Sequence, residues 1–280
     1  MNTLMSPMKK RVQRVQALSI LTFKEGIRER AIYGIGLAAL IFSSISIPIT
    51  GFFMRDLDKI SVDFNLAAVS FSSLLLLFFV SINLMAKDME RKTIFFVLSK
   101  PFSRGEYILG KLGGLIVLST TAVGVLSLAA FGSILITKNI YPQHFSSFTW
   151  PGFFIAVYGH ILMLVLLNAI VVFFSTLTSS SFLTLLFSVS TYIAGQTIEE
   201  VYFFLQHQSE AVPLSGFVKT TIDILHYAGP NLSVFDLKAM AAHSLPVSGA
   251  YILSITLYAL VYSGILAGAA TFIFGRRNFS

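Results

Sequence analysis

The chain has 280 residues, of which 55% are hydrophobic and 12% are charged, and its mean hydropathy is +0.79. Soluble domains carry about 25% charged residues, and a soluble core of this size could not bury so many apolar side chains. The composition excludes a soluble globular fold and a disordered chain, and indicates a protein solvated by the bilayer. The chain has no cysteine, which excludes disulfides, thiolate metal sites and cysteine nucleophiles.

Six apolar runs are long enough to cross a bilayer, since a helix needs about 20 residues to span a ~30 Å hydrocarbon core. The expected spans cover residues 31–53, 64–86, 111–137, 152–175, 182–205 and 247–274. No run alternates as the strands of a membrane β-barrel do, and residues 1–10 lead into charge rather than into the apolar core of a signal peptide. We expect an all-α integral membrane protein with a single transmembrane domain over residues 1–280.

Basic residues are distributed unevenly between the two sides that six spans define. Fifteen of the 20 lysines and arginines fall in residues 1–30, in the loop after the second span and in the C-terminal tail, and five fall on the other side. Cytoplasmic loops carry an excess of Lys and Arg, so both termini are expected in the cytoplasm and the chain in the inner membrane. The net charge of +7 is then a topology signal, because no segment outside the spans is large enough for a nucleic-acid-binding domain.

Residues 10–30 are predicted to form an amphipathic helix. Ile20, Phe23 and Ile27 repeat at intervals of three and four, while Glu25 lies on the opposite side and Arg28 flanks the stripe. Such a helix can lie along the inner leaflet and turn into the first span. A basic segment that only fixes the topology is the alternative.

The loop after the second span, residues 87–104, is expected to contain a helix and a sharp stop before the next helix begins. Asp88 and Glu90 stand where acids stabilise a first helical turn, and Pro101 ends that helix. Ser103 and Glu106 match the S-x-x-E pattern of a capping box. A short amphipathic helix with charged ends suits a groove on a soluble partner, and a helix that rests on lipid is the alternative.

The outer segment, residues 206–246, is too long for a simple connection. Prolines and glycines divide it, and we expect short helices over 217–228 and 233–243, the second capped by Ser233. Its apolar side chains are expected to dip into the outer leaflet or to cover the mouth of a pathway. They are Phe217, Ile222, Leu225, Leu232, Phe235 and Leu237.

One stretch has the pattern of a phosphate-binding loop without its context. Residues 105–111 match G-x-x-x-x-G-K, yet Leu112 stands where the pattern needs a Ser or Thr for Mg²⁺, and no strand precedes the stretch. We therefore expect no nucleotide site here. Small residues allow close helix packing instead, and those expected to do so are Gly110, Gly113 and Gly114, with Gly264 and Gly268 in the sixth span.

Few ionisable groups lie within the spans, which disfavours a proton- or sodium-coupled carrier. A metal site at Met240 and His243 is disfavoured because no tight ligand cluster accompanies them, and His160 is expected to hydrogen-bond a neighbouring helix. The chain is expected to hold no catalytic residue, metal or cofactor of its own. The polar side chains that could line a transport pathway are Ser70, Ser72, Asn83, Ser188, Thr191, Glu199 and Glu200.

The stretch DMERKTIFFVLSKPFSRGEYILGK, from Asp88 to Lys111, resembles the membrane subunits of type 2 ABC exporters. Their pattern has an acid, a Thr and a short apolar helix, followed by s-K-P-x-s-R and l-G-K. The segments TFKEGIRER (Thr22–Arg30) and PNLSVFD (Pro230–Asp236) are also similar to that family. The resemblance covers nearly the whole chain, and its nearest branch is the permeases of copper-enzyme maturation, such as those of nitrous oxide reductase systems.

The resemblance implies half of a transporter. Two six-span subunits, expected as a homodimer, would each sit on a separate cytoplasmic ATPase that binds ATP and Mg²⁺. Spans one, two and five would line the pathway, and residues 206–246 would lie over its exit. No obvious copper ligands accompany the resemblance, so copper is not carried over as the substrate.

The same resemblance implies two segments that transmit motion between the ATPase and the spans. Residues 88–98 would form the coupling helix, and residues 10–30 the connecting helix. The implied coupling residues are Asp88, Glu90, Arg91, Lys92, Thr93, Ile94, Phe95, Phe96, Leu98, Lys100, Pro101 and Arg104, and those of the connecting helix are Ile20, Phe23, Glu25, Ile27 and Arg28.

Three functions are therefore weighed. The first is the permease subunit of an ATP-driven exporter of a lipid or other amphipathic molecule. The second is an integral membrane enzyme acting on lipid, which would need acids, histidines or metal ligands converging at one depth, and the sequence offers no such set. The third is a scaffold that anchors an ATPase without transport, which the sequence separates poorly from the first.

Overall fold

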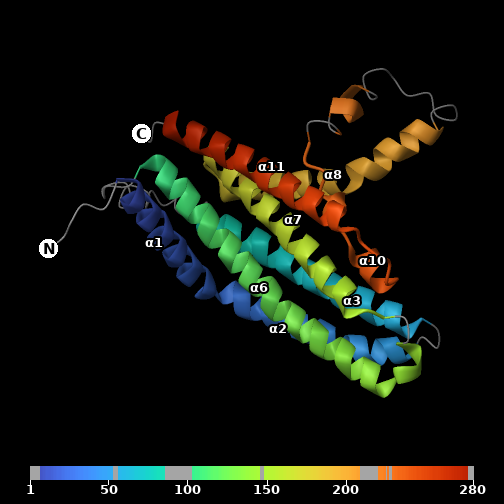
Figure 1. Ribbon diagram of the computed structural model, residues 1–280. Helices are drawn as coiled ribbons and strands as arrows, with labels where there is room; N and C mark the ends of the chain where they lie inside the picture. The colour runs from blue at the N-terminus through green and yellow to red at the C-terminus, as the bar shows by residue number, and fades with distance from the viewer. Residues whose placement is uncertain are drawn as a thin grey trace.

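The computed structural model describes residues 7–52, 56–85, 103–145, 148–208, 220–224, 226 and 229–276, and within them the chain is helical with no strand. The bundle consists of long helices that run side by side (Figure 1). In chain order the elements are α1 (Pro7–Ile27), α2 (Arg30–Phe52), α3 (Leu57–Leu76), the π-helix η1 (Leu77–Ser81), α6 (Arg104–Ile140), η2 (Pro142–His144), α7 (Trp150–Leu177), α8 (Ser181–Gln208), η3 (Ser233–Phe235), α10 (Lys238–Ala242) and α11 (Gly249–Arg276).

The six expected spans are confirmed as helices of sufficient length and apolarity to cross a membrane. They cover Arg30–Phe52, Leu57–Met85, Arg104–Ile140, Trp150–Leu177, Ser181–Leu205 and Gly249–Arg276. The second and third begin seven residues earlier than predicted, since hydropathy marks only the part of a helix that sits in hydrocarbon. Charged and polar residues at a helix end extend the helix without extending its apolar run.

The early start of α6 is explained by its cap. Ser103 Oγ accepts a hydrogen bond from the backbone N–H of Glu106 at 3.2 Å, and Glu106 Oε2 accepts one from the Ser103 N–H at 2.9 Å. These two bonds are the predicted capping box, which satisfies two backbone donors that a helix start would otherwise leave without partners.

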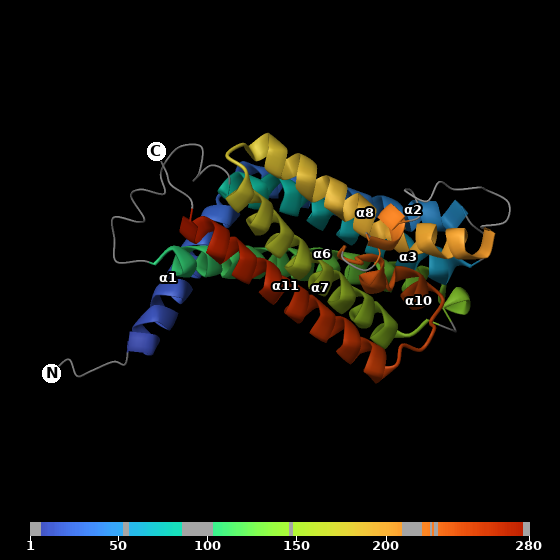
Figure 2. The ribbon, with the colours of Figure 1, turned by 90° about the horizontal axis from the view of Figure 1, so that it is seen from above.

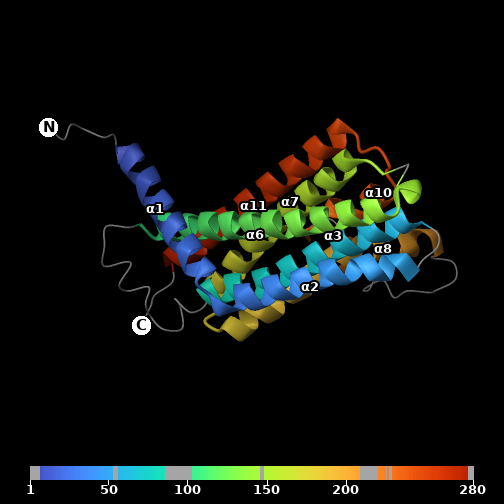
Figure 3. The same ribbon diagram turned by 90° about the horizontal axis from the view of Figure 1, so that it is seen from below.

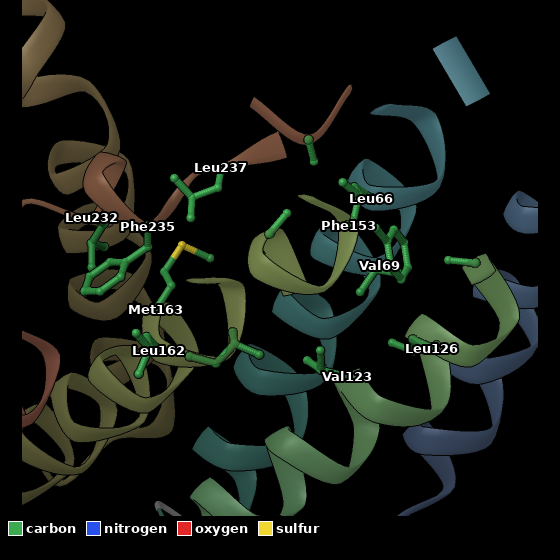
Figure 4. Packing of buried hydrophobic residues seen from close by; sticks show 14 of the residues in the cluster. Leu66, Val69, Val123, Leu126, Phe153, Leu162, Met163, Leu232, Phe235 and Leu237 are labelled. Carbon is green, nitrogen blue, oxygen red and sulfur yellow. The ribbon is translucent and has the colours of Figure 1, made fainter. Parts of the chain in front are cut away.

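The helix α7 forms the centre of the bundle. It contacts α3, α6, α8 and α11, and 78% of its most apolar stretch is buried, against 17% for α2 and for α8. Viewed from above, it lies beneath α8 and alongside α11 (Figure 2). Its side chains Phe153, Leu162 and Met163 meet Val69 of α3 and Val123 of α6 in the main hydrophobic cluster (Figure 4).

The outer segment contains less helix than predicted, and the expected helix over 233–243 is wrong. The chain forms the short 3-10 turn η3 and then α10, a helix of five residues. Ser233 does not cap a helix, because its N–H and its Oγ both donate to Asn231 Oδ1. Residues 220–224 and 226 of the predicted helix over 217–228 are helical, and the rest of that prediction largely lies outside the described residues.

Residues 229–237, here called the outer strap after the side predicted for them, pack into the helix bundle. Leu232, Phe235 and Leu237 are buried in the main hydrophobic cluster (Figure 4). The Leu232 N–H donates to the Gly195 carbonyl at 2.8 Å. At Gly195 a Cβ atom would lie 2.5 Å from the carbonyl oxygen of Pro230, so the close approach requires glycine.

Candidate functional site

The second and third spans approach each other at the base of the loop that joins them. Lys111 Nζ of α6 lies 3.4 Å from the carbonyl oxygen of Leu84, near the end of the second span, and 3.5 Å from Glu25 Oε2 of α1. Only 4% of the Lys111 side chain is exposed. The buried ammonium group thus contacts a backbone acceptor and a carboxylate together. Lys111 therefore joins three segments at one point.

A second ionic contact fixes the start of α6 to α1. Glu106 Oε1 lies 3.3 Å from Arg14 Nη2 and 3.9 Å from Arg11 Nε, while the other carboxylate oxygen completes the capping box at Ser103. The Glu106 side chain is only 7% exposed. A buried carboxylate is costly unless it is paired and hydrogen-bonded, and Glu106 has both kinds of partner. The same side chain therefore supports both the cap and the contact to α1.

Between these two contacts the helices α1 and α6 are close enough to exclude side chains larger than glycine. A Cβ atom at Gly110 would lie 2.7 Å from Leu18, and one at Gly114 would lie 2.5 Å from the Cβ of Thr22. Ser19 Oγ donates to the Gly110 carbonyl at 2.9 Å. The predicted close packing at these glycines is confirmed, and its partner is α1, which lies across the start of α6 (Figures 1 and 3).

The glycines of the sixth span behave differently. No described atom would lie within 4 Å of a Cβ at Gly264 or at Gly268, apart from the helix itself and the chain neighbours. Neighbouring Leu260 and Ile265 are exposed on α11. Within the described part of the chain, no helix packs closely against this pair.

The helix α1 presents two different faces. Leu18 and Thr22 are buried against α6, whereas Ile20 and Ile27 of the predicted apolar stripe are 56% and 41% exposed. Phe23 is partly buried. The stripe is therefore left free to contact lipid while the small-residue face contacts protein, which matches a helix at the membrane surface.

Arg104 ties the start of α6 to the end of α11. Its Nη1 donates to the carbonyl oxygens of Phe274 and Gly275, each at 3.1 Å. Tyr107 stacks on Phe274 with ring centroids 5.6 Å apart. The start of α6 is thus held by α11 through Arg104 and by α1 through Glu106.

Of the predicted coupling residues, Arg104 is the one that the structure places. The other eleven, and the predicted coupling helix 88–98, lie outside the described residues. In the predicted connecting helix, Glu25 contacts Lys111 and Arg28 is exposed in the turn between α1 and α2.

The predicted pathway residues do not gather around one channel. Ser70, Ser72 and Ser188 are buried within the bundle, and Asn83 is exposed. Thr191 lines a cavity of about 420 Å³ between α7, α8 and α11. The remaining two, Glu199 and Glu200, are exposed on α8, where the Glu199 carboxylate accepts a hydrogen bond from Asn231 Nδ2 of the outer strap at 2.7 Å.

A buried polar network joins α2, α3 and α6, and sequence reasoning missed it. Asn65 Nδ2 donates to Ser46 Oγ at 2.9 Å, and Ser46 Oγ lies 2.8 Å from Ser133 Oγ. Ser133 Oγ also donates to the Ser43 carbonyl at 2.7 Å. An asparagine at the edge of an apolar run was the available signal, because amides in spans commonly bond to neighbouring helices.

His160 makes the helix-to-helix hydrogen bond that was predicted for it. Its Nε2 lies 2.6 Å from Ser73 Oγ, which joins α7 to α3. Among the residues that the structure describes, no group of three His, Asp or Glu side chains is placed to hold a metal ion.

Comparison with known proteins adds one finding to this geometry. The family model described as ABC-2 family transporter protein matches residues 17–278. No curated protein matches the chain.

Proposed function

Because the chain belongs to the ABC-2 transporter family, and is therefore a membrane permease component of an ABC transporter, we propose that it exports a lipid or other amphipathic molecule. A separate cytoplasmic ATPase subunit, in two copies that carry ATP and Mg²⁺, would drive the cycle. Members of this family generally work with such a subunit. Both termini and the 86–102 segment would then face the cytoplasm, as the excess of basic residues at those positions favours.

The observation that carries the proposal is the junction at Lys111. A coupling helix over residues 88–98 would move when the ATPases close on ATP. That segment follows Leu84, whose carbonyl contacts Lys111, and Lys111 in turn contacts Glu25, so the displacement would reach α1 and, through the adjoining turn, α2. Nucleotide binding would in this way shift the spans between two arrangements.

The proposal of an amphipathic substrate is supported by the cavity between α7, α8 and α11. Phe174, Phe187 and Tyr262 supply aromatic walls, and Ser190 supplies a hydroxyl group, whereas the Thr191 hydroxyl donates to the Phe187 carbonyl of its own helix at 2.8 Å. A lining that is mostly apolar with a few polar groups suits an amphipathic ligand. Its residues all belong to membrane-length helices or to the adjoining strap, which favours a substrate that enters from the bilayer.

We also propose that two copies of the chain pair through α2 and α8. These two spans are the least buried of the six, so a second subunit could cover them. We further propose that the chain belongs to the branch that serves copper-enzyme maturation, to which its resemblance is nearest. Copper itself is not proposed as the cargo.

The experiment is reconstitution of the chain with its co-purifying ATPase in liposomes that contain a fluorescent phospholipid. We expect ATP-dependent movement of the lipid between leaflets together with stimulated ATP hydrolysis. Replacing Ile94, Phe95 and Phe96 by alanine should abolish both, whereas a matched triple replacement of the exposed Leu253, Leu257 and Leu260 should abolish neither.

Two results would contradict the proposal in different ways. If no ATPase accompanies the folded chain from its native membrane, coupling to an ATPase is wrong. If hydrolysis is stimulated but neither labelled lipid nor any other amphipathic probe moves, the scaffold function is favoured over transport.

A further inference from the structure

An apolar groove of about 240 Å³ lies where α1 turns into α2. Phe23 and Ile27 of α1 and Ile35 of α2 form one wall, and Leu118 and Val125 of α6 form the other. Thr121 also lines it, but its hydroxyl donates to the Val117 carbonyl of its own helix at 2.8 Å, so it offers little to a polar ligand. We call this the elbow groove.

The dimensions of the elbow groove suit one hydrocarbon chain. Along α6 its lining runs from Leu118 to Leu126, which is about 12 Å of helical rise. Its volume falls below the ~300–1,000 Å³ of sites that enclose a drug-sized ligand. A second protein copy would need a contact of more than about 1,000 Å², which a groove of this width does not supply.

Exposed basic residues are neighbours in the chain of residues that line the elbow groove. Lys24, Arg28 and Arg30 are exposed within three residues of lining residues Phe23, Ile27 and Ile32. Because Glu25 contacts Lys111, the three cations of the elbow stand against one further acid, Glu29, and a net positive charge remains.

We propose that the elbow groove binds an acyl chain of an anionic phospholipid of the surrounding bilayer, whose headgroup is held by Lys24, Arg28 and Arg30. The apolar groove matches the acyl chain of such a lipid, and the neighbouring cations match its anionic headgroup. The lipid would sit between α1 and the spans and would brace the elbow. The site lies apart from the cavity of the proposed substrate and does not depend on the proposed function.

The test is native mass spectrometry of the full-length chain after removal of bound lipid and addition of phosphatidylglycerol or phosphatidylcholine. Gly36 lines the groove and Gly34 does not, and a Cβ at either position would meet no atom within 4 Å. Gly36→Phe should therefore remove binding of both lipids by filling the groove. Gly34→Phe, a matched change on the same helix, should leave binding unchanged.

The headgroup half of the proposal is tested by charge removal. The wild-type chain should bind phosphatidylglycerol more tightly than phosphatidylcholine. Arg28→Gln combined with Arg30→Gln should weaken phosphatidylglycerol binding about fivefold for each charge removed and leave phosphatidylcholine binding unchanged. Lys9→Gln combined with Lys10→Gln, which removes two exposed charges distant along α1, should have no effect.

Three results would overturn the proposal. They are equal binding of the two lipids by the wild-type chain, retention of lipid by Gly36→Phe, and equal loss of lipid in the two glycine variants. Should Gly36→Phe fail to fold, the wild-type protein is instead labelled with phosphatidylglycerol that carries a photoreactive acyl chain. Labelling of residues 118–126 is expected, and labelling that avoids them refutes the site.

Discussion

The ammonium group of Lys111 and the carboxylate of Glu25 meet at 3.5 Å although 86 positions separate them in the chain. Lys111 also lies 3.4 Å from the Leu84 carbonyl, so one buried side chain connects α1, the end of the second span and α6. This junction stands at the base of the segment predicted to contact an ATPase, where a small displacement would reach several helices together.

Removing the charge of Lys111 should weaken this junction. In Lys111→Met the carbonyl of the buried Leu84 loses a partner, and leaving a buried acceptor unsatisfied costs about 1–3 kcal/mol. Glu25 also loses this partner, but its side chain is 41% exposed and can be hydrated. We expect a lower thermal midpoint in detergent together with reduced stimulation of the ATPase. Lys138→Met, at the opposite end of α6, is the control and should retain stimulation. Normal coupling in a folded Lys111→Met chain would show that the junction is only structural.

The glycine contact between α1 and α6 should be intolerant of even small side chains. At Gly114 a new Cβ would overlap with Thr22 and with the Ser19 carbonyl, so Gly114→Ala should destabilise the bundle by about 1–3 kcal/mol, as overpacking does. Gly124→Ala on the same helix meets no atom within 4 Å and should be neutral or slightly stabilising. Unfolding monitored in mixed micelles compares the two variants, and equal effects would contradict the described approach of α1.

The outer strap should detach when its glycine contact is blocked. In Gly195→Ala the added Cβ would lie 2.5 Å from the Pro230 carbonyl and would disturb the hydrogen bond from the Leu232 N–H. We expect faster hydrogen exchange in residues 229–242, with little change in α1 and α6. Gly268→Ala is the control because its Cβ position is open. Unchanged exchange in the strap would mean that it is held mainly by its buried apolar side chains.

The polar network around Asn65 should contribute modestly to stability. Hydrogen bonds between membrane helices average about 0.6 kcal/mol and reach about 1.7 kcal/mol, so Asn65→Ala should cost an amount in that range. Asn83→Ala, an exposed amide in the same span, should cost less. Unfolding in detergent with increasing dodecyl sulfate provides the comparison. A loss well above the range would indicate that the network holds α2, α3 and α6 together cooperatively.

Local sequence predicted those features that depend on short-range chemistry. The apolar runs predicted six spans, because only a helix of that length satisfies its backbone in hydrocarbon. Ser103 and Glu106 predicted a cap, because the two side chains reach each other across one helical turn. His160 was predicted to bond to another helix, and the sequence could not name Ser73 as the partner.

The sequence-based expectations that the structure did not bear out concern places where contacts between distant segments outweigh local preference. Residues 233–243 have the composition of a helix, yet the hydrogen bonds of Asn231 and Leu232 hold the strap in turns against α8 and α11. The sequence predicted the same close packing for Gly110, Gly113 and Gly114 of α6 and for Gly264 and Gly268 of α11, yet only the three of α6 meet another described helix.

The sequence by itself determined that the chain lies in a bilayer, that it has six spans and that α6 has a capped start. Composition, the length of apolar runs and contacts within one helical turn are local properties that can be read without the fold. The tertiary structure alone decided that Lys111 meets Glu25, that α1 packs on the glycines of α6, and that the outer strap is buried. Each of these depends on which helices become neighbours. Packing geometry fixes that choice, because similar apolar surfaces leave many pairings open to a chain in the bilayer.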